Sequence, residues 1–177
     1  MNLYVDFDGI IVDSWPVIVK KYYNHYLTDS IEEKRLRELF KICDWNEILK
    51  ECKKNRNNIE TLKKIEKYNV TILTKINSLS EKRAKEKFLK DNNIKIKIKT
   101  VNIDSKKTDI VKAQNNILID DEIKNLKDWK ECGGIGILYS KNKDGKDSDG
   151  ILNDEFFTIF SLNDNFINNL FAGKENI

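Results

Sequence analysis

The chain has few of the residues that mark several common classes of protein. Its three cysteines, Cys43, Cys52 and Cys132, are odd in number, widely spaced and outside any Cys-x-x-Cys pair. This pattern excludes a disulfide framework and a cysteine zinc site, and it suits a reducing cytosol. Acidic residues occur within the first positions, so no signal peptide is expected, and no apolar run approaches the ~20 residues of a membrane helix. We therefore expect a cytoplasmic protein without a membrane partner.

The chain also lacks a strong charge of either sign. It carries 32 basic and 29 acidic residues, for a net charge of +3. Such an even balance gives no electrostatic reason to expect a nucleic-acid partner. It leaves open an anionic small substrate that binds in a local pocket.

Short apolar segments with strand character alternate along the 177 residues with segments of helical spacing. This alternation predicts an α/β fold, a parallel sheet with helices on both faces. One stretch, residues 14–57, has only helical character and follows directly after the first strand. We therefore expect a core made of residues 1–13 and 58–177, with a small helical cap made of residues 14–57. The predicted strands cover residues 3–5, 70–73, 94–101, 117–119, 135–139 and 156–160.

Several polar residues predict where helices begin or end. Ser78 and Glu81 have the spacing of a capping box, which predicts a helix that starts there. Ser161 is expected to cap the last helix, and Thr108–Ala113 to form a short one. The asparagines at 57–58 are expected to separate two helices.

Acidic residues follow two of the predicted strands. Asp6 and Asp8 are two positions apart, so both side chains can face one cleft, and Gly9 allows a sharp turn beside them. Asp120 and Asp121 follow a later strand. Parallel strands bring their carboxyl ends to one edge, and a group of carboxylates there needs a cation and suits Mg²⁺. Taken alone, the first motif is also typical of a turn, and the second is typical of a helix N-terminal cap.

Four segments together resemble the motifs of the haloacid dehalogenase (HAD) superfamily, in the same order. They are Asp-Phe-Asp-Gly-Ile-Ile-Val-Asp-Ser (6–14), Ile-Leu-Thr (72–74), a lysine near 107 and Ile-Leu-Ile-Asp-Asp (117–121). Within the superfamily, residues 119–126, Trp129 and the glycine-rich segment 133–137 resemble the 5'(3')-deoxyribonucleotidases and their bacterial and phage relatives. The resemblance implies a HAD-like Rossmannoid fold and Mg²⁺-dependent phosphatase activity.

The resemblance also implies a role for each motif residue. Asp6 would attack phosphorus and form an aspartyl phosphate, and Asp8 would act as general acid and base. The Asp6 carboxylate, the Asp8 backbone carbonyl and the Asp121 carboxylate would hold Mg²⁺, with Asp120 supporting them. Thr74 would bind the phosphoryl group.

A lysine would complete the set of groups that bind the phosphoryl group. Lys107 is favoured over Lys106 and Lys112 because Lys-Thr-Asp-Ile-Val (107–111) resembles the family's local pattern. The lysine of the family usually stands nearer the aspartate pair than Lys107 does. Dehalogenases of the superfamily lack the second acidic residue of the first motif, so Asp8 argues for phosphate chemistry.

The expected substrate is a nucleoside or deoxynucleoside monophosphate. Aromatic side chains in the predicted cap are expected to pack its core, and one or two of them could stack on a base: Trp15, Tyr22, Tyr23, Tyr26, Phe40 and Trp45. His25 among them is expected to be structural. The alternatives are another small phosphomonoester, such as a sugar phosphate, or a catalytically weak domain that binds through a lysine face. That face would be Lys95, Lys97 and Lys99, which alternate with isoleucines and are expected to keep one face of a strand solvated.

The loop from Lys141 to Gly150 is rich in aspartate but does not fit a calcium site. In the register of an EF-hand loop, Gly145 would take the first ligand position and Phe156 the last, and neither can serve. A solvated loop is expected there.

Overall fold

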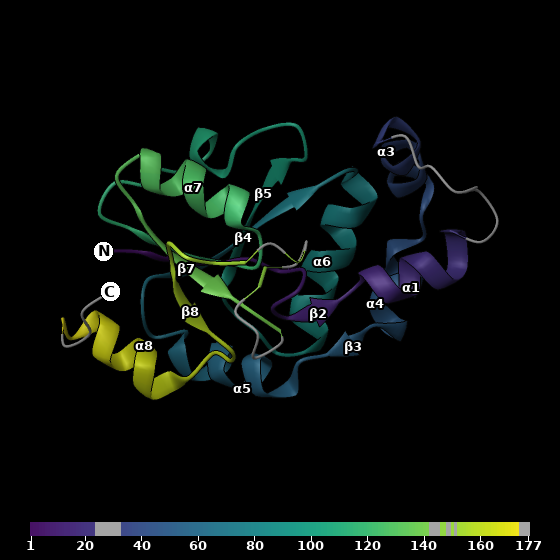
Figure 1. The fold of residues 1–177 in the computed structure, drawn as a ribbon. Helices are drawn as coiled ribbons and strands as arrows, with labels where there is room; N and C mark the ends of the chain where they lie inside the picture. The colour runs from purple at the N-terminus through teal and green to yellow at the C-terminus, as the bar shows by residue number, and fades with distance from the viewer. Residues whose placement is uncertain (24–32, 142–145, 148–149, 151, 174–177) are drawn as a thin grey trace.

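Six parallel strands form one sheet in the computed structural model, which describes residues 1–23, 33–141, 146–147, 150 and 152–173 (Figure 1). The strand order is β5-β4-β1-β6-β7-β8, with β1 near the centre. This confirms the predicted α/β fold with a parallel sheet. The strands are β1 (Leu3–Val5), β4 (Val70–Ile76), β5 (Lys97–Asn102), β6 (Ile117–Asp120), β7 (Ile135–Tyr139) and β8 (Phe157–Ile159).

Helices cover both faces of the sheet because its buried strands are apolar on both sides. On β1, Leu3 and Val5 join one hydrophobic cluster and Tyr4 joins the other. The first cluster includes side chains of α5 (Arg56–Ile65), α6 (Leu79–Asp91) and α8 (Asp164–Phe171). The second lies under α7 (Ile123–Glu131), whose fully buried Trp129 meets Tyr4 edge to face at 5.2 Å. Among the described helices, none is long and apolar enough to cross a bilayer.

Residues 14–57 are mostly helical, as predicted, but they include a short strand near their end, which belongs to a separate two-stranded sheet. The helices are α1 (Trp15–Ile18), a π-helical turn (Val19–Tyr23), α3 (Glu33–Ile42) and α4 (Trp45–Glu51). The prediction of an all-helical segment is wrong at its end, where β3 (Lys53–Lys54) pairs antiparallel with β2 (Val12–Asp13). This pairing satisfies backbone groups of both segments where the chain leaves and re-enters the core. The predictions for Tyr23, His25 and Tyr26 concern side chains outside the described part of the chain.

The asparagines at 57–58 do not separate two helices, because both lie inside α5. Asn55 caps this helix, and its side chain accepts a hydrogen bond from the Asn58 backbone at 3.2 Å. Asn58 is fully buried and links distant segments: its amide donates to the Ile10 carbonyl and accepts from the Leu162 backbone. These tertiary hydrogen bonds outweigh the weak helix propensity of asparagine.

Two other helix predictions need correction and one is confirmed. Asn163, not Ser161, caps α8, with its side chain accepting from two backbone groups. Lys107–Asp109 form only a 3₁₀ turn, where a helix over 108–113 was expected. The helix predicted at Ser78 does begin there, and Ser78 Oγ accepts from the Glu81 backbone at 3.2 Å.

Candidate active site

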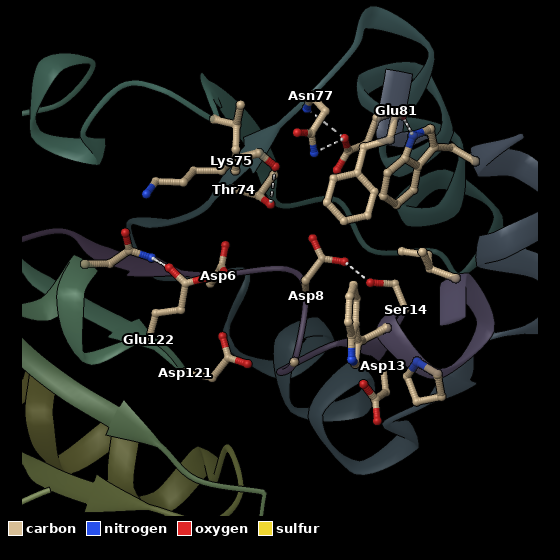
Figure 2. A pocket seen from close by; sticks show the side chains of 18 of the residues that line it. Asp6, Asp8, Asp13, Ser14, Thr74, Lys75, Asn77, Glu81, Asp121 and Glu122 are labelled. Carbon is tan, nitrogen blue, oxygen red and sulfur yellow. Dashed lines mark hydrogen bonds between the residues drawn. The ribbon is translucent and has the colours of Figure 1, made fainter. Parts of the chain in front are cut away.

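A cavity of about 460 Å³ opens where the carboxyl ends of β1, β4 and β6 meet. Asp6 and Asp8 enter it from the end of β1, Thr74 from β4, and Asp121 from the residue after β6. Figure 2 shows these four side chains around one space. Parallel strands explain this gathering, since their carboxyl ends lie along the same edge of the sheet.

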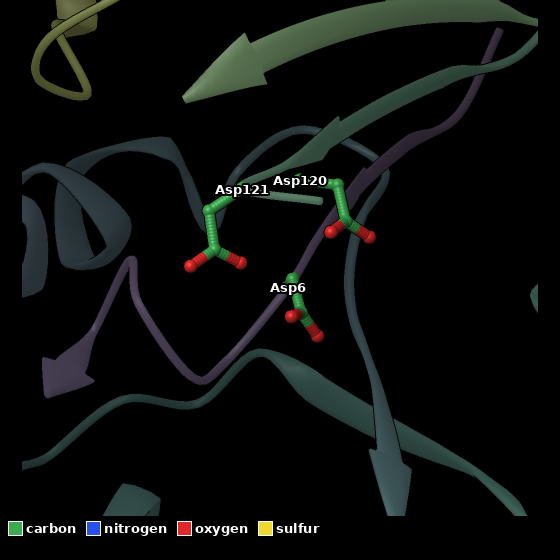
Figure 3. Close-up of side chains that lie close together, drawn as sticks. All are labelled: Asp6, Asp120 and Asp121. Carbon is green, nitrogen blue, oxygen red and sulfur yellow. The ribbon is translucent and has the colours of Figure 1, made fainter. Parts of the chain in front are cut away.

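Three carboxylates, those of Asp6, Asp120 and Asp121, lie close together at this edge of the sheet (Figure 3). Oxygens of Asp6, Asp120 and Asp121 lie within 4.8 Å of one another, and all three residues are buried. Burial, together with the neighbouring carboxylates of Asp120 and Asp8, raises the pKa of Asp6 to about 6, against the opposing effect of Lys107. Burial and the charges of Asp120 and Asp6 also raise the pKa of Asp121 well above its usual value. Burial and the neighbouring carboxylates therefore disfavour the ionised forms of Asp6 and Asp121.

Lys107 is the lysine that reaches this cluster. Its Nζ lies 2.6 Å from Asp120 Oδ2 and 2.9 Å from Asp6 Oδ1. Burial alone would lower the pKa of Lys107, but the two carboxylates raise it. Lys106 instead pairs with Asp128 on the surface, and Lys112 is exposed.

Asp120 is surrounded by hydrogen-bond donors, which distinguishes it from the other two carboxylates. Besides Lys107, it accepts from the Glu122 backbone at 3.0 Å and from the Asn125 side-chain amide at 3.2 Å. Glu122, not Asp120 or Asp121, stands at the N-cap position of α7. The alternative prediction, that the aspartate pair caps this helix, is therefore wrong. The arrangement of Asp120 suits a supporting role.

Gly9 allows Asp121 to approach the turn after β1. Gly9 has φ = +74°, and a Cβ there would stand 1.7 Å from Asp121 Oδ2. Only glycine satisfies both the backbone conformation and the contact. The result is a cradle of buried carboxylate oxygens, the ligand type that Mg²⁺ prefers, so the residues present fit this ion.

Asp8 is held from two sides by residues that sequence analysis gave no role. Ser14 Oγ donates to Asp8 Oδ1 at 2.9 Å, and Lys85 Nζ donates to Asp8 Oδ2 at 2.6 Å. Ser14 belongs to the first motif, which offered a signal for it. Lys85 offered none, because an i,i+4 pair of Glu81 with Lys85 on a helix is typical of a solvated surface.

Glu122 and Asn125 form another part of the cavity wall that sequence analysis missed. The Asn125 amide donates to Glu122 Oε2 at 2.8 Å as well as to Asp120. Burial, followed by the charges of Asp120 and Asp6, raises the pKa of Glu122 to about 7. The sequence places Glu122 directly after the aspartate pair, but it does not show that this side chain turns into the cavity.

An aromatic cluster, defined as Trp15, Phe40 and Trp45, also lines the cavity. Phe40 meets Trp15 at 6.4 Å and Trp45 at 6.2 Å between ring centres. Trp45 is 4% exposed and donates its indole N–H to the Phe40 carbonyl, which makes it part of the packing. Trp15 is 46% exposed. It is therefore the most exposed member of the cluster.

Comparison with known proteins finds similarity in structure but not in sequence. No family model and no curated protein sequence matches the chain. A D,D-heptose 1,7-bisphosphate phosphatase from Burkholderia thailandensis superposes with a TM-score of 0.58 at 14% identity, over 96% of this chain and 99% of that one. A haloacid dehalogenase-like hydrolase from Streptococcus pneumoniae gives 0.59 at 13% identity, over 96% and 97%.

A HAD-superfamily hydrolase of subfamily IA from Geobacter sulfurreducens gives 0.57 at 13% identity, over 94% of this chain and 97% of that one. These solved structures are matched over nearly their whole length. At such low sequence identity, the structural similarity shows only a shared fold. The chain therefore has the α/β fold of HAD-superfamily hydrolases.

Proposed function

We propose that this chain is a Mg²⁺-dependent phosphomonoesterase that works through an aspartyl phosphate on Asp6. The observation that carries the proposal is the convergence of Asp6, Asp8, Thr74 and Lys107 on one cavity at the carboxyl edge of a HAD-like sheet. Each of these residue types matches a need of phosphoryl transfer: a nucleophile, an acid and base, a hydroxyl donor and a positive charge.

In the proposed reaction, a carboxylate oxygen of Asp6 attacks phosphorus and the bond to the ester oxygen breaks. Asp8 gives its proton to the departing alkoxide, which leaves as an alcohol. Asp8 then takes a proton from water, and the water oxygen attacks phosphorus. Inorganic phosphate leaves and the Asp6 carboxylate is regenerated. Lys107 and Thr74 bind phosphoryl oxygens throughout.

Asp6, Asp121 and the backbone carbonyl of Asp8 would hold the magnesium ion, and Asp120 would support them. When bound, Mg²⁺ would neutralise the charge on the phosphoryl oxygens. The raised pKa values of Asp6 and Asp121 support a cation here, because a nearby positive charge would favour the ionised forms that burial and the neighbouring carboxylates disfavour.

Our first choice of substrate is a nucleoside or deoxynucleoside monophosphate. The exposed ring of Trp15 on the cavity wall favours this choice, because an aromatic face can stack on any base. Residues 14–57 would act as a small cap that helps to exclude water from the cleft. We propose a cytoplasmic location, on the cysteine content given above.

A sugar phosphate is the second candidate, and the likeness to a heptose bisphosphate phosphatase favours it. A weakly catalytic binding domain is the third candidate. Lys95, Lys97 and Lys99 are indeed exposed at the sheet edge, but the complete set of acidic residues in the cavity argues against this role.

The test is a phosphatase assay on purified protein, with Mg²⁺ and after exhaustive chelation, across nucleoside monophosphates and sugar phosphates. We expect release of inorganic phosphate only with Mg²⁺ and a higher kcat/KM for nucleotides. A protein that releases phosphate equally well without divalent cations would refute the mechanism. A preference for sugar phosphates would refute the choice of substrate alone.

A further inference from the structure

Lys85 is a buried cation beside the cavity that has no part in the proposed chemistry. It lies on α6 and is fully buried. Its Nζ is 2.6 Å from Asp8 Oδ2, 2.8 Å from Glu81 Oε1 and 3.0 Å from Thr74 Oγ1. A fourth oxygen, the Lys75 carbonyl, also lies at 3.0 Å. The ammonium group therefore joins β4, α6 and the turn after β1.

Lys85 stays charged in this environment. Burial would lower its pKa, but the carboxylates of Asp8 and Glu81 raise it to about 12. The rings of Phe7 and Trp45 flank the ammonium group at 5.3 and 5.9 Å, and such faces attract cations. A buried charge is costly unless it is paired and hydrogen-bonded, and here these partners make the pairing complete.

The contact with Lys85 fixes the orientation of the Asp8 carboxylate. Ser14 anchors one carboxylate oxygen and Lys85 anchors the other, so rotation about the last bond of the side chain is restricted. The Asp8 side chain nevertheless keeps 34% of its surface exposed, whereas that of Lys85 has none. Lys85 therefore does not reach a bound substrate in this geometry and acts through Asp8.

The same ammonium group also determines how the Thr74 hydroxyl is used. An ammonium group only donates hydrogen bonds, so Thr74 Oγ1 must accept the one from Lys85. The hydroxyl hydrogen of Thr74 is then free to be donated. In this structure it is donated to the Lys75 carbonyl at 3.3 Å. A phosphoryl oxygen in the cavity would be a better acceptor for this hydrogen.

Glu81 is the second carboxylate that holds Lys85 in place. One carboxylate oxygen accepts from Lys85, and the other accepts from the Asn77 backbone at 2.8 Å. Glu81 is 2% exposed, so solvent does not weaken this pair. The loop after β4 and the start of α6 are thereby tied to the ammonium group.

We propose that Lys85 is a positioning residue, which orients Asp8 for protonation of the leaving group and Thr74 for donation to the phosphoryl group. The proposal rests on the phosphatase function proposed above. It predicts a defect that depends on the leaving group. An alkoxide needs a proton as it departs, whereas para-nitrophenolate is stable enough to leave without one.

The experiment compares kcat/KM of Lys85→Met and wild type for a nucleoside 5'-monophosphate and for para-nitrophenyl phosphate. This parameter reports the step in which the ester bond breaks. We expect the loss for the nucleotide to exceed the loss for the aryl ester by about tenfold or more, a part of the usual contribution of a general acid. Lys82→Met is the matched control. Lys82 lies on the same helix, is partly exposed and pairs loosely with Glu86 at 3.9 Å, so its loss should change neither value.

Lys85→Met leaves the Glu81 carboxylate buried without a counter-charge, which can prevent folding. The double variant Lys85→Met/Glu81→Gln removes both charges and should show the same dependence on the leaving group. A thermal melt shows which of the two variants is folded. If kcat/KM of a folded variant falls equally for the two esters, the positioning role is overturned and the proposed function stays intact. Wild-type protein that hydrolyses neither ester would overturn both.

Discussion

The floor and the roof of the cavity differ in composition and in burial. The floor consists of Asp6, Thr74, Lys107 and Asp121, all at most 8% exposed. Asp6, Thr74 and Asp121 belong to or directly follow strands of the core sheet, and Lys107 begins a 3₁₀ turn after β5. The roof is the aromatic cluster, which comes from the helices after β2, and its Trp15 is 46% exposed. Charged groups that act on a substrate must be held in fixed positions, and a rigid sheet provides this.

The contrast suggests that chemistry and substrate choice are divided between two parts of the chain. Changes in the floor should reduce turnover of every substrate. Changes in the roof should alter affinity for some substrates and leave turnover intact.

The largest effect is expected from Asp6→Asn. This change keeps the shape of the side chain but removes the attacking charge, so turnover of every ester should fall by more than about 10³-fold, to background. Melting temperature should not fall, because the change removes one charge from a crowded acidic cluster. Steady-state assays with a thermal melt check both points. More than a tenth of wild-type turnover would exclude Asp6 as nucleophile.

A smaller effect is expected from Lys107→Met, with Lys106→Met as its matched control. Lys107 pairs with Asp6 and Asp120, whereas Lys106 pairs with Asp128 on the surface. Loss of one group that stabilises charge in the transition state costs about 10²-fold in kcat. We therefore expect a loss of this size for Lys107→Met and little change for its neighbour. Similar kcat values for the two variants would show that Lys107 does not stabilise the transition state.

Magnesium should stabilise the folded protein, and more so at pH 7 than at pH 5. The pKa of Asp6 is raised to about 6, so the folded state holds a proton there that the unfolded chain loses near pH 4. Without metal, this group therefore lowers the free energy of unfolding as pH rises from about 4 to 6. Mg²⁺ binds the ionised form, and at 100 times its dissociation constant it adds about 2.7 kcal/mol.

Differential scanning fluorimetry at both pH values, with MgCl₂ and with KCl at matched ionic strength, checks this expectation. A melting temperature that Mg²⁺ fails to raise at pH 7 would contradict a metal site in the floor. Asp6→Asn should reduce the effect of the ion.

The smallest effect is expected in the roof, from Trp15→Ala. Loss of one stacked base costs about 1–3 kcal/mol in nucleic-acid binding sites, so KM for a nucleotide should rise about tenfold or more. KM for para-nitrophenyl phosphate should stay unchanged. Trp45→Ala is the comparison, because its buried, hydrogen-bonded indole should affect stability and both substrates alike. If Trp15→Ala changes KM for the nucleotide and for para-nitrophenyl phosphate equally, the result would argue for a general phosphatase.

Sequence reasoning found the residues whose position follows from the order of the strands. Asp6, Asp8, Thr74 and Asp121 lie near the ends of segments that were recognisable as strands, and parallel pairing then brings them to one edge. It missed Lys85, whose spacing from Glu81 equally fits a solvated helix face. It also erred at the asparagines of α5, where a buried hydrogen-bond network stabilises a helix that local propensity does not favour.

The sequence by itself determined the parallel α/β fold and the position of the carboxylates, because strand periodicity and motif order are local properties of the chain. Only the tertiary structure decided which lysines pair with those carboxylates and which aromatic ring remains exposed. Lys106 and Lys107 are neighbours in sequence, yet one lies on the surface and the other is 3% exposed beside Asp6. The physical reason is that burial and ion pairing depend on segments far apart in the chain, which meet only when the sheet and its helices pack together.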